Sequence, residues 1–93
     1  MGKVFFSRSA ERDLKRLPKL ALHELQTKHI LRLELNPRAG KMLHGPLRGY
    51  FAYEFWSDTV SYRIAYEISS GDVIILMIDS RDNFYKKFSR RTV

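Results

Sequence analysis

The sequence contains no cysteine, which excludes disulfide bridges, thiolate zinc sites, iron–sulfur clusters and thiol nucleophiles. It also lacks any apolar run approaching the roughly 18 residues that would span a bilayer. The apolar stretch near the N-terminus, residues 4–6, is too short for a signal peptide. We therefore expect a cytoplasmic protein with no membrane partner.

The sequence motifs that bind common cofactors are missing as well. There is no Walker lysine loop, no dinucleotide-binding glycine pattern, no nucleophile elbow and no pair of carboxylates at catalytic spacing. His23 and His29 lie roughly 240° apart around a helix, so they do not converge on one metal ion, and His29 is expected to be a partly buried helix residue. We expect no bound metal and no small-molecule cofactor.

The length and composition fit one small folded domain. Independent cores usually need on the order of 100 residues, so the chain is expected to form a single domain over residues 1–93. A hydrophobic content of 44% and an aromatic content of 13% argue against intrinsic disorder.

Positive charge is abundant and unevenly distributed. The net charge is +7; residues 1–48 carry 11 basic and 4 acidic side chains, residues 49–80 carry 1 and 5, and residues 81–93 carry 5 and 1. Surface lysines and arginines can simply keep helices soluble. Two basic segments that bracket an acidic one nevertheless favour a polyanion, above all a nucleic acid, as the partner.

The first half of the sequence predicts a strand followed by two helices. Residues 3–6 suit a short strand, and Ser7 or Ser9 can cap a helix in which apolar residues recur at helical spacing. Pro18 ends this helix and can open the next, which runs to Asn36 with Leu22, Leu25, His29 and Leu33 on one face. The two helices are expected to form a helical hairpin.

The second half changes to a period of two. Residues 50–56, 60–68 and 73–78 predict three strands joined by short turns, that is, an antiparallel meander. Asn83 can cap a short final helix that carries Phe84, Tyr85 and Phe88. The predicted fold class is α+β: an N-terminal strand, a helical hairpin packed on the meander, and a short C-terminal helix.

Arg63 is the first candidate for a functional residue. It is the only basic residue of the acidic middle segment, and the alternation of its strand places it between Ser61 and Ala65 on the face that the helical hairpin leaves open. Small neighbours leave room for a phosphate on the guanidinium. An ion pair with Glu54 or Glu67 is an equally good interpretation at this point.

Three further residues lie near the ends of the predicted strands. Arg81 directly follows the last strand, and Tyr85 lies four residues later, where an opening helix would return it to the same side. Packing of Tyr85 beneath the sheet as an amphipathic core residue is the commoner case for an isolated tyrosine. His44 lies in a Gly-Pro turn that could bring it to a cleft, although a plain loop position is the simpler interpretation.

Five short motifs accompany this order of predicted elements. They are Phe6-Ser7, Asn36-Pro37, Leu43-His44-Gly45-Pro46-Leu47-Arg48-Gly49-Tyr50, Tyr62-Arg63-Ile64-Ala65-Tyr66 and Arg81-Asp82-Asn83-Phe84-Tyr85. With these motifs, the sequence resembles the RelE/ParE toxin superfamily over nearly the whole chain. The resemblance implies a RelE-like fold and a toxin of a type II toxin–antitoxin system that is held by a cognate acidic antitoxin.

The resemblance also assigns roles to residues. The functional positions of the superfamily match Arg63, Arg81 and Tyr85, whereas residues 50–56 lack the basic residues that RelE-like members place on that strand. Glu54 or His44 could take their place, since toxins resembling YoeB employ a carboxylate and a histidine. The basic residues expected to contact RNA are Arg12, Lys15, Arg16, Lys19, Arg48, Lys86 and Lys87.

For the RelE branch, the resemblance implies a metal-independent endoribonuclease that cleaves messenger RNA on the ribosome by attack of the 2′-hydroxyl on the adjacent phosphorus. Only RNA carries that nucleophile. Two alternatives stay open: a ParE-like toxin that binds DNA gyrase and cleaves nothing, and a non-toxic basic module that binds nucleic acid.

Overall fold

The N-terminal strand and the first helix form as the sequence predicts. The computed structural model describes residues 2–92, and it begins with strand β1 (Val4–Phe6) and helix α1 (Arg8–Arg16). The hydroxyl of Ser7 accepts a hydrogen bond of 3.1 Å from the amide of Ala10, which satisfies one of the free donors at the helix start. The helix ends at Leu17, since a residue before proline disfavours helical backbone.

The second helical segment is one rod with a wide turn in its middle. Helix α2 (Lys19–Glu24) continues through a π-helical turn (Leu25–His29) into helix α3 (Ile30–Leu35). Of the predicted apolar face, Leu25 and Leu33 are fully buried, while Leu22 and His29 are half-buried. No helix among residues 2–92 has the length and apolar character needed to cross a membrane.

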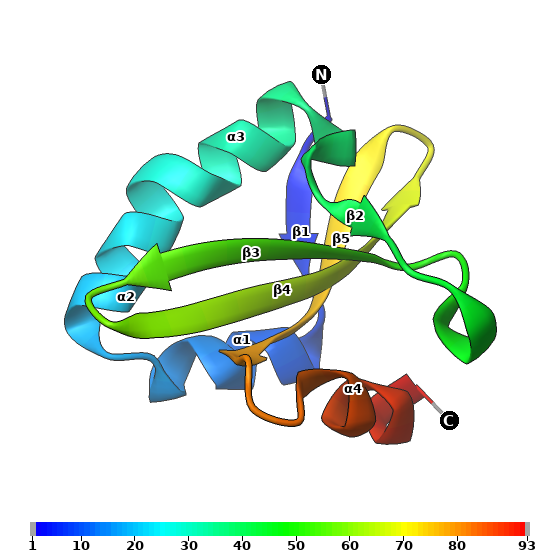
Figure 1. Cartoon of the computed structure of the whole chain (residues 1–93). Helices are drawn as coiled ribbons and strands as arrows, with labels where there is room; N and C mark the ends of the chain where they lie inside the picture. The colour runs from blue at the N-terminus through cyan, green and yellow to red at the C-terminus, as the bar shows by residue number, and fades with distance from the viewer. Residues whose placement is uncertain (1, 93) are drawn as a thin grey trace.

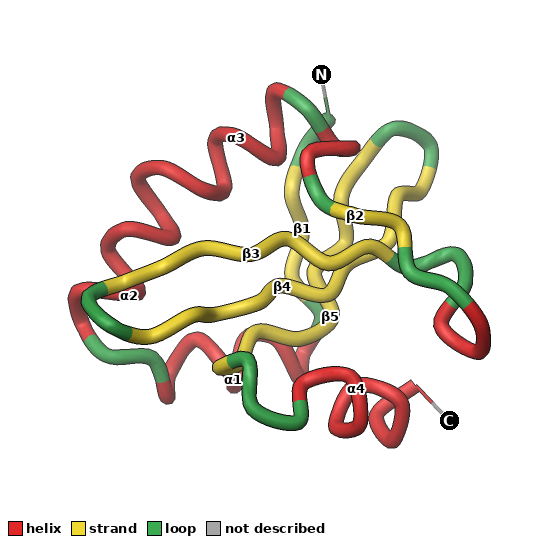
Figure 2. The backbone as a smooth tube through the Cα atoms, viewed as in Figure 1, coloured by secondary structure: helices red, strands yellow, loops and turns green. Residues whose placement is uncertain are grey.

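The predicted meander is confirmed and gains a strand at each edge. Strands β3 (Phe51–Ser57), β4 (Val60–Ser69) and β5 (Asp72–Ser80) are antiparallel, and the sheet order is β1-β5-β4-β3-β2. Strand β1 pairs parallel to β5, and the two-residue strand β2 (Lys41–Met42) pairs with β3. Figure 2 shows both additions at the margins of the sheet. Neither pairing is predicted from the sequence.

The sheet separates two hydrophobic clusters. Residues Tyr62, Ile64 and Tyr66 of β4 face the α1–α3 side, whereas Ala65 faces helix α4 (Phe84–Thr92) on the other. Phe84 and Phe88 anchor α4 there with 1% and 0% exposure, as predicted. The helices therefore lie on both sides of the sheet (Figure 1), and the alternation of β4 places Arg63 on the α4 side.

Asn83 occupies the cap position before α4 that the sequence predicts, and its backbone carbonyl accepts the first helical hydrogen bond, of 3.0 Å, from the amide of Lys87. Among the described residues, however, its side chain makes no capping hydrogen bond. Asn83 adopts a left-handed φ of 55°, whereas a residue that caps with its side chain usually has extended backbone. The tight turn after β5 imposes this conformation, which asparagine tolerates better than most residues.

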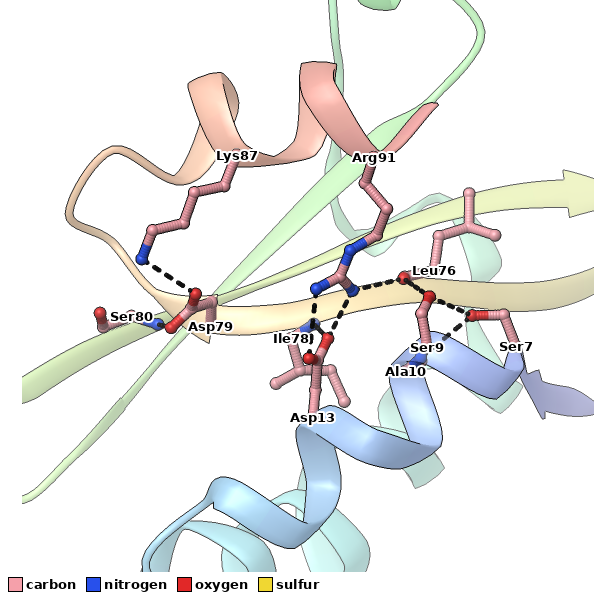
Figure 3. Close-up of polar contacts among 10 residues, drawn as sticks. All are labelled: Ser7, Ser9, Ala10, Asp13, Leu76, Ile78, Asp79, Ser80, Lys87 and Arg91. Atoms are coloured by element: carbon pink, nitrogen blue, oxygen red, sulfur yellow. Dashed lines mark hydrogen bonds and ion pairs between the residues drawn. The ribbon is translucent and has the colours of Figure 1, made fainter. Parts of the chain in front are cut away.

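A buried carboxylate joins α1, β5 and α4. Asp13 is only 6% exposed; it accepts hydrogen bonds from the backbone amide of Ile78 at 3.0 Å and from the guanidinium of Arg91 at 2.7 and 3.3 Å. Arg91 also donates to the carbonyl of Leu76. Figure 3 shows the guanidinium of α4 reaching across β5 to α1. Asp13 thus provides a hydrogen-bond acceptor for an amide of β5 that lies beyond the end of the pairing with β1.

We expect Asp13→Ala to lower the free energy of unfolding by about 2–4 kcal/mol, because it leaves a buried amide and a partly buried guanidinium without their acceptor. Arg91→Ala removes only the half-exposed partner and is expected to cost about 1–2 kcal/mol. Urea unfolding followed by circular dichroism measures both.

The matched control is Lys87→Ala, which removes an ion pair with Asp79 whose two side chains are 48% and 39% exposed. Exposed pairs contribute roughly 0–1 kcal/mol, so this variant should stay close to the parent protein. Equal losses for all three variants would contradict the special role of Asp13.

Candidate active site

The centre of the candidate site is a cross-strand pair on the open face of the sheet. Glu54 of β3 lies directly opposite Arg63 of β4 in the strand register. The guanidinium Nη2 donates to Oε2 of Glu54 at 3.1 Å, and the hydroxyl of Ser61 donates to the same oxygen at 2.9 Å. The ion pair with Glu54 that the sequence left open is therefore formed.

The same guanidinium also contacts the C-terminal helix. Nη1 of Arg63 donates a hydrogen bond of 2.6 Å to the hydroxyl of Tyr85, and its central carbon lies 5.3 Å from the centre of the tyrosine ring. Tyr85 is 40% exposed, so it does not pack beneath the sheet as a core residue. Arg63 and Tyr85, which lie 22 positions apart, meet as expected.

These three side chains line a cleft of about 350 Å³. Two further cations, Arg32 of α3 and Lys41 of β2, come from segments that sequence reasoning did not assign to the site. Strand β2 pairs only with the first two residues of β3, Phe51 and Ala52. The cleft lies along the edge of β3 beyond this pairing. The remaining lining residues are Ala39, Gly40, Ala52 and Tyr53.

Gly40 determines the position of Lys41. A Cβ at Gly40 would lie 2.7 Å from the carbonyl oxygen of Ala52 and from the hydroxyl of Tyr66, so only glycine permits this close approach. The hydroxyl of Tyr66 accepts from the amide of Gly40 and donates to the carbonyl of Pro37, in the 3₁₀ turn Pro37–Ala39. Burial raises the pKa of Tyr66, which keeps this hydroxyl protonated as a donor.

The environment of Glu54 favours its ionised form. The hydrogen bond from Ser61, followed by that from Arg63, lowers the pKa of Glu54, and the positive charge of Arg81 adds to the effect. Both hydrogen bonds end on Oε2. Within the described residues, Oε1 makes no such bond and can accept a proton.

The other predicted site residues lie outside this cleft. Arg81 is exposed and lines a neighbouring hollow, while its backbone amide donates to the carbonyl of Ser61. His44 is exposed at the start of the 3₁₀ turn Gly45–Leu47 and is not part of the cleft wall. The structure thus unites Arg63, Tyr85 and Glu54, keeps Arg81 next to them, and leaves His44 apart.

The predicted RNA-binding cations fall into two groups. Arg12, Lys15, Arg16 and Lys19 are exposed on α1 and the start of α2, which cover the sheet face opposite the cleft. Lys86 and Arg48 are exposed on the α4 side, whereas Lys87 is engaged with Asp79 at 3.2 Å.

Histidine and acidic residues do not gather into a metal site in the part of the chain that the structure describes: no group of three or more could hold an ion. His29 is accounted for by packing, because its ring stacks on Phe55 at 4.5 Å and its Nδ1 lies 2.7 Å from the hydroxyl of Tyr53. Burial lowers the pKa of His29, which favours the neutral ring.

Comparison with known protein families identifies the family to which this chain belongs. A family model described as "ParE-like toxin of type II bacterial toxin-antitoxin system" matches residues 4–89. The chain belongs to this toxin family. No curated protein sequence matches the toxin.

Solved structures share the fold of the toxin. A chain of the toxin–antitoxin complex RelBE2 from Mycobacterium tuberculosis is 32% identical, with a TM-score of 0.75 over 86% of this chain and 91% of that one. The isolated RelE toxin of E. coli is 18% identical, with a TM-score of 0.69, and the match covers 100% of each chain. A YoeB/ParE toxin from Agrobacterium tumefaciens (19%, TM-score 0.68) is matched over 85% of this chain and 98% of that one. The RelE-like fold predicted from the sequence is confirmed.

We expect the pKa of Glu54 in the folded protein to lie below its ordinary value of 4.5, because the hydrogen bonds from Ser61 and Arg63 stabilise the ionised carboxylate. The stabilisation is present above the pKa of the unfolded chain and is lost as the pH falls through the lowered pKa of the folded protein. Side-chain carboxyl NMR shifts, followed during an acid titration, measure it. Ser61→Ala should raise the pKa of Glu54, whereas Ser89→Ala, on α4, should leave it unchanged; an unmoved value in Ser61→Ala would contradict the assignment.

Proposed function

We propose that this toxin is a ribosome-dependent endoribonuclease that cleaves messenger RNA and thereby inhibits translation. The observation that carries the proposal is that Arg63 is hydrogen-bonded to both Tyr85 and Glu54 in an open cleft that all three residues line. A cation, a phenol and an ionised carboxylate are the groups that a phosphoryl-transfer site needs for charge stabilisation and proton transfer.

In the proposed reaction, the 2′-hydroxyl oxygen of one nucleotide attacks the adjacent phosphorus. Glu54 accepts the proton of that hydroxyl, and Arg63 stabilises the charge that develops on the phosphate oxygens. The bond from phosphorus to the 5′-oxygen breaks, and Tyr85 donates a proton to the leaving oxygen. The products are a 2′,3′-cyclic phosphate and a free 5′-hydroxyl.

Arg63 must exchange partners during this cycle. Its two terminal nitrogens are engaged by Tyr85 and Glu54, and its Nε is buried without a hydrogen-bond partner among the described residues. A phosphate is a stronger acceptor for the guanidinium than a phenol and can form two parallel bonds with it. RNA would therefore compete for contacts that hold the empty site together.

Lys41 and Arg32 would supply the positive charge that β3 lacks. RelE-like toxins place basic residues on the strand before the Tyr-Arg motif, and this toxin has none on β3. In the structure, a cation from each side of that strand reaches the cleft instead. We assign to them contacts with the RNA backbone inside the cleft.

The ribosome would supply the orientation that such a small site cannot impose. The cleft is open, and the exposed cations of α1 and α2 lie on the other face of the sheet, where they can contact ribosomal RNA. Holding the message in place removes much of the entropy cost of reaching the reactive geometry.

A ParE-like toxin that binds DNA gyrase and cleaves nothing is the second candidate. Two observations favour it: the description of the matching family model as ParE-like, and the absence of a basic residue from β3. A gyrase supercoiling assay run beside cleavage on translating ribosomes separates the two candidates.

We expect Arg63→Ala to lower cleavage on translating ribosomes about 10²–10³-fold, which is the usual cost of removing one transition-state charge partner. Tyr85→Phe should also reduce cleavage, since it keeps the ring and removes the proton donor. Lys41→Ala should reduce it less. Primer extension on a translated message measures the rates.

Two control variants test whether a loss of activity comes from the cleft itself, rather than from a lower net charge or from the loss of any hydroxyl group. Lys28→Ala removes a lysine that is 67% exposed on the helical face, and Tyr50→Phe removes a hydroxyl beside Phe88, away from the cleft wall. Both should cleave normally. Full activity of Arg63→Ala would contradict the assignment of this cleft as the active site. Inhibition of gyrase without cleavage of RNA would support the second candidate, a ParE-like toxin.

We also propose that a cognate acidic antitoxin neutralises the toxin. Leu20, Leu31 and Leu35 are 55%, 51% and 60% exposed on the α2–α3 rod, among basic side chains, so an acidic partner helix would find both apolar anchors and charge there. The RelBE2 relative is itself a toxin–antitoxin complex.

Co-expression with the neighbouring small open reading frame should yield a stable complex, in which hydrogen exchange slows along α2–α3. If the partner acts by displacing α4, exchange in α4 should instead accelerate on binding. A free protein that is harmless at high expression, with no co-purifying partner, would leave the non-toxic nucleic-acid-binding module as the better account.

A further inference from the structure

A second hollow lies beside the cleft and contains the only tryptophan of the chain. Its volume is about 310 Å³. Trp56 forms one wall from the C-terminal part of β3, and Arg81 forms another directly after β5. The other lining residues are Thr59, Val60, Ser61, Ser80 and Asp82.

Trp56 is unusual in being left in solvent. Trp56 is 57% exposed, whereas its neighbours on β3, Phe55 and Ser57, are only 3% and 5% exposed. Val60, also in the hollow, is 39% exposed. Indole is among the largest apolar side chains, and its burial would stabilise the fold, so an exposed indole in a concave site is suited to covering by a ligand.

The hollow is linked to the cleft through Ser61, which lines the hollow and bonds to a residue of the cleft. Ser61 lies opposite Trp56 in the register of β3 and β4, and its hydroxyl donates to Glu54 at 2.9 Å. Trp56 and Glu54 are two positions apart on one strand, so they share a face of the sheet. Arg81 is close enough to lower the pKa of Glu54 through its charge.

Resting on the proposed function, we infer that this hollow is a second nucleotide subsite, which binds a nucleotide next to the scissile phosphate in single-stranded RNA. The base stacks on the indole of Trp56, and Arg81 binds the phosphate of the same nucleotide. Every base offers a flat face to an aromatic ring, and only unpaired bases can present it.

The chemistry of the wall agrees with this occupant. Stacking needs an aromatic face, and the phosphate needs a cation; Trp56 and Arg81 provide one of each in the lining of a single hollow. Thr59, Ser80 and Asp82 add hydroxyl and carboxylate groups that can hydrogen-bond to the edge of a base. The inference thus gives Arg81, which matches a functional position of the superfamily, a phosphate beside the scissile one.

The single tryptophan makes the test direct, because all indole fluorescence reports on this hollow. The probe is a short single-stranded RNA with 2′-O-methyl groups, which cannot be cleaved through the 2′-hydroxyl. We expect saturable quenching of Trp56 at low salt, and binding about tenfold weaker in Arg81→Gln. For variants without the indole, the anisotropy of a labelled RNA replaces fluorescence: Trp56→Phe should bind close to normally and Trp56→Ala about tenfold more weakly.

Leu35→Ala is the matched control, because it also removes an apolar side chain that is 60% exposed but lies on α3. It should bind the probe normally, and each variant is checked by urea unfolding so that loss of folding is recognised. RNA that binds by anisotropy without quenching Trp56, or equal affinities for Trp56→Ala and the parent, would overturn the subsite. Quenching by the antitoxin but not by RNA would assign the hollow to a protein partner and likewise overturn it.

Cleavage on translating ribosomes distinguishes the subsite from the proposed function itself. If the parent protein cleaves and Trp56→Ala cleaves equally well at every codon, the subsite is refuted and the nuclease stands. If the parent protein cleaves nothing, the nuclease proposal fails, while the quenching experiment still decides whether the hollow binds RNA.

Discussion

The geometry of the candidate site depends on the carboxylate of Asp13. This residue lies on α1, yet its two oxygens satisfy an amide of β5 and the guanidinium of Arg91 on α4. A nine-residue helix is marginal in isolation, so α4 relies on this contact and on Phe84 and Phe88 for its position. Tyr85 meets Arg63 only because α4 is held in that place.

The charges of the sheet are arranged so that the acidic middle segment does not repel a polyanion. Glu54 is engaged by Arg63 and Ser61, Asp79 by Lys87, and Asp72 by the backbone amide of Lys3. Among the described residues, the exposed cations of the helices are not neutralised in this way, apart from Lys28, which pairs with Glu24, Lys87, which pairs with Asp79, and Arg91. A nucleic acid therefore meets positive charge first and reaches the carboxylate only inside the cleft.

The sequence predicts the parts of the site that follow from local pattern. The strict alternation over residues 60–68 places Arg63 on the open face, and the proximity of Tyr85 to the end of β5 brings it back to the same side. Lys41 could not be found in this way, because β2 has only two residues and no period of its own. Its place is determined by the approach of Gly40 to Ala52 and Tyr66, which are distant in sequence.

The same limit explains the remaining misses. The parallel pairing of β1 with β5 joins residues about 70 positions apart, and three-residue strands carry no signal of their partner. Asn83 does precede α4 as predicted, but its left-handed backbone goes with the absence of the side-chain capping bond that its residue type suggests. Long-range packing, rather than local propensity, decided these features.

The two hollows on the open face are coupled through Ser61. Its hydroxyl is the largest single cause of the lowered pKa of Glu54, and the same residue lines the hollow of Trp56 and Arg81. A nucleotide that drew the Ser61 hydroxyl into a new hydrogen bond would raise the pKa of Glu54 and make it a stronger base. Ser61 thus links the carboxylate of the cleft to the wall of the hollow that contains Trp56.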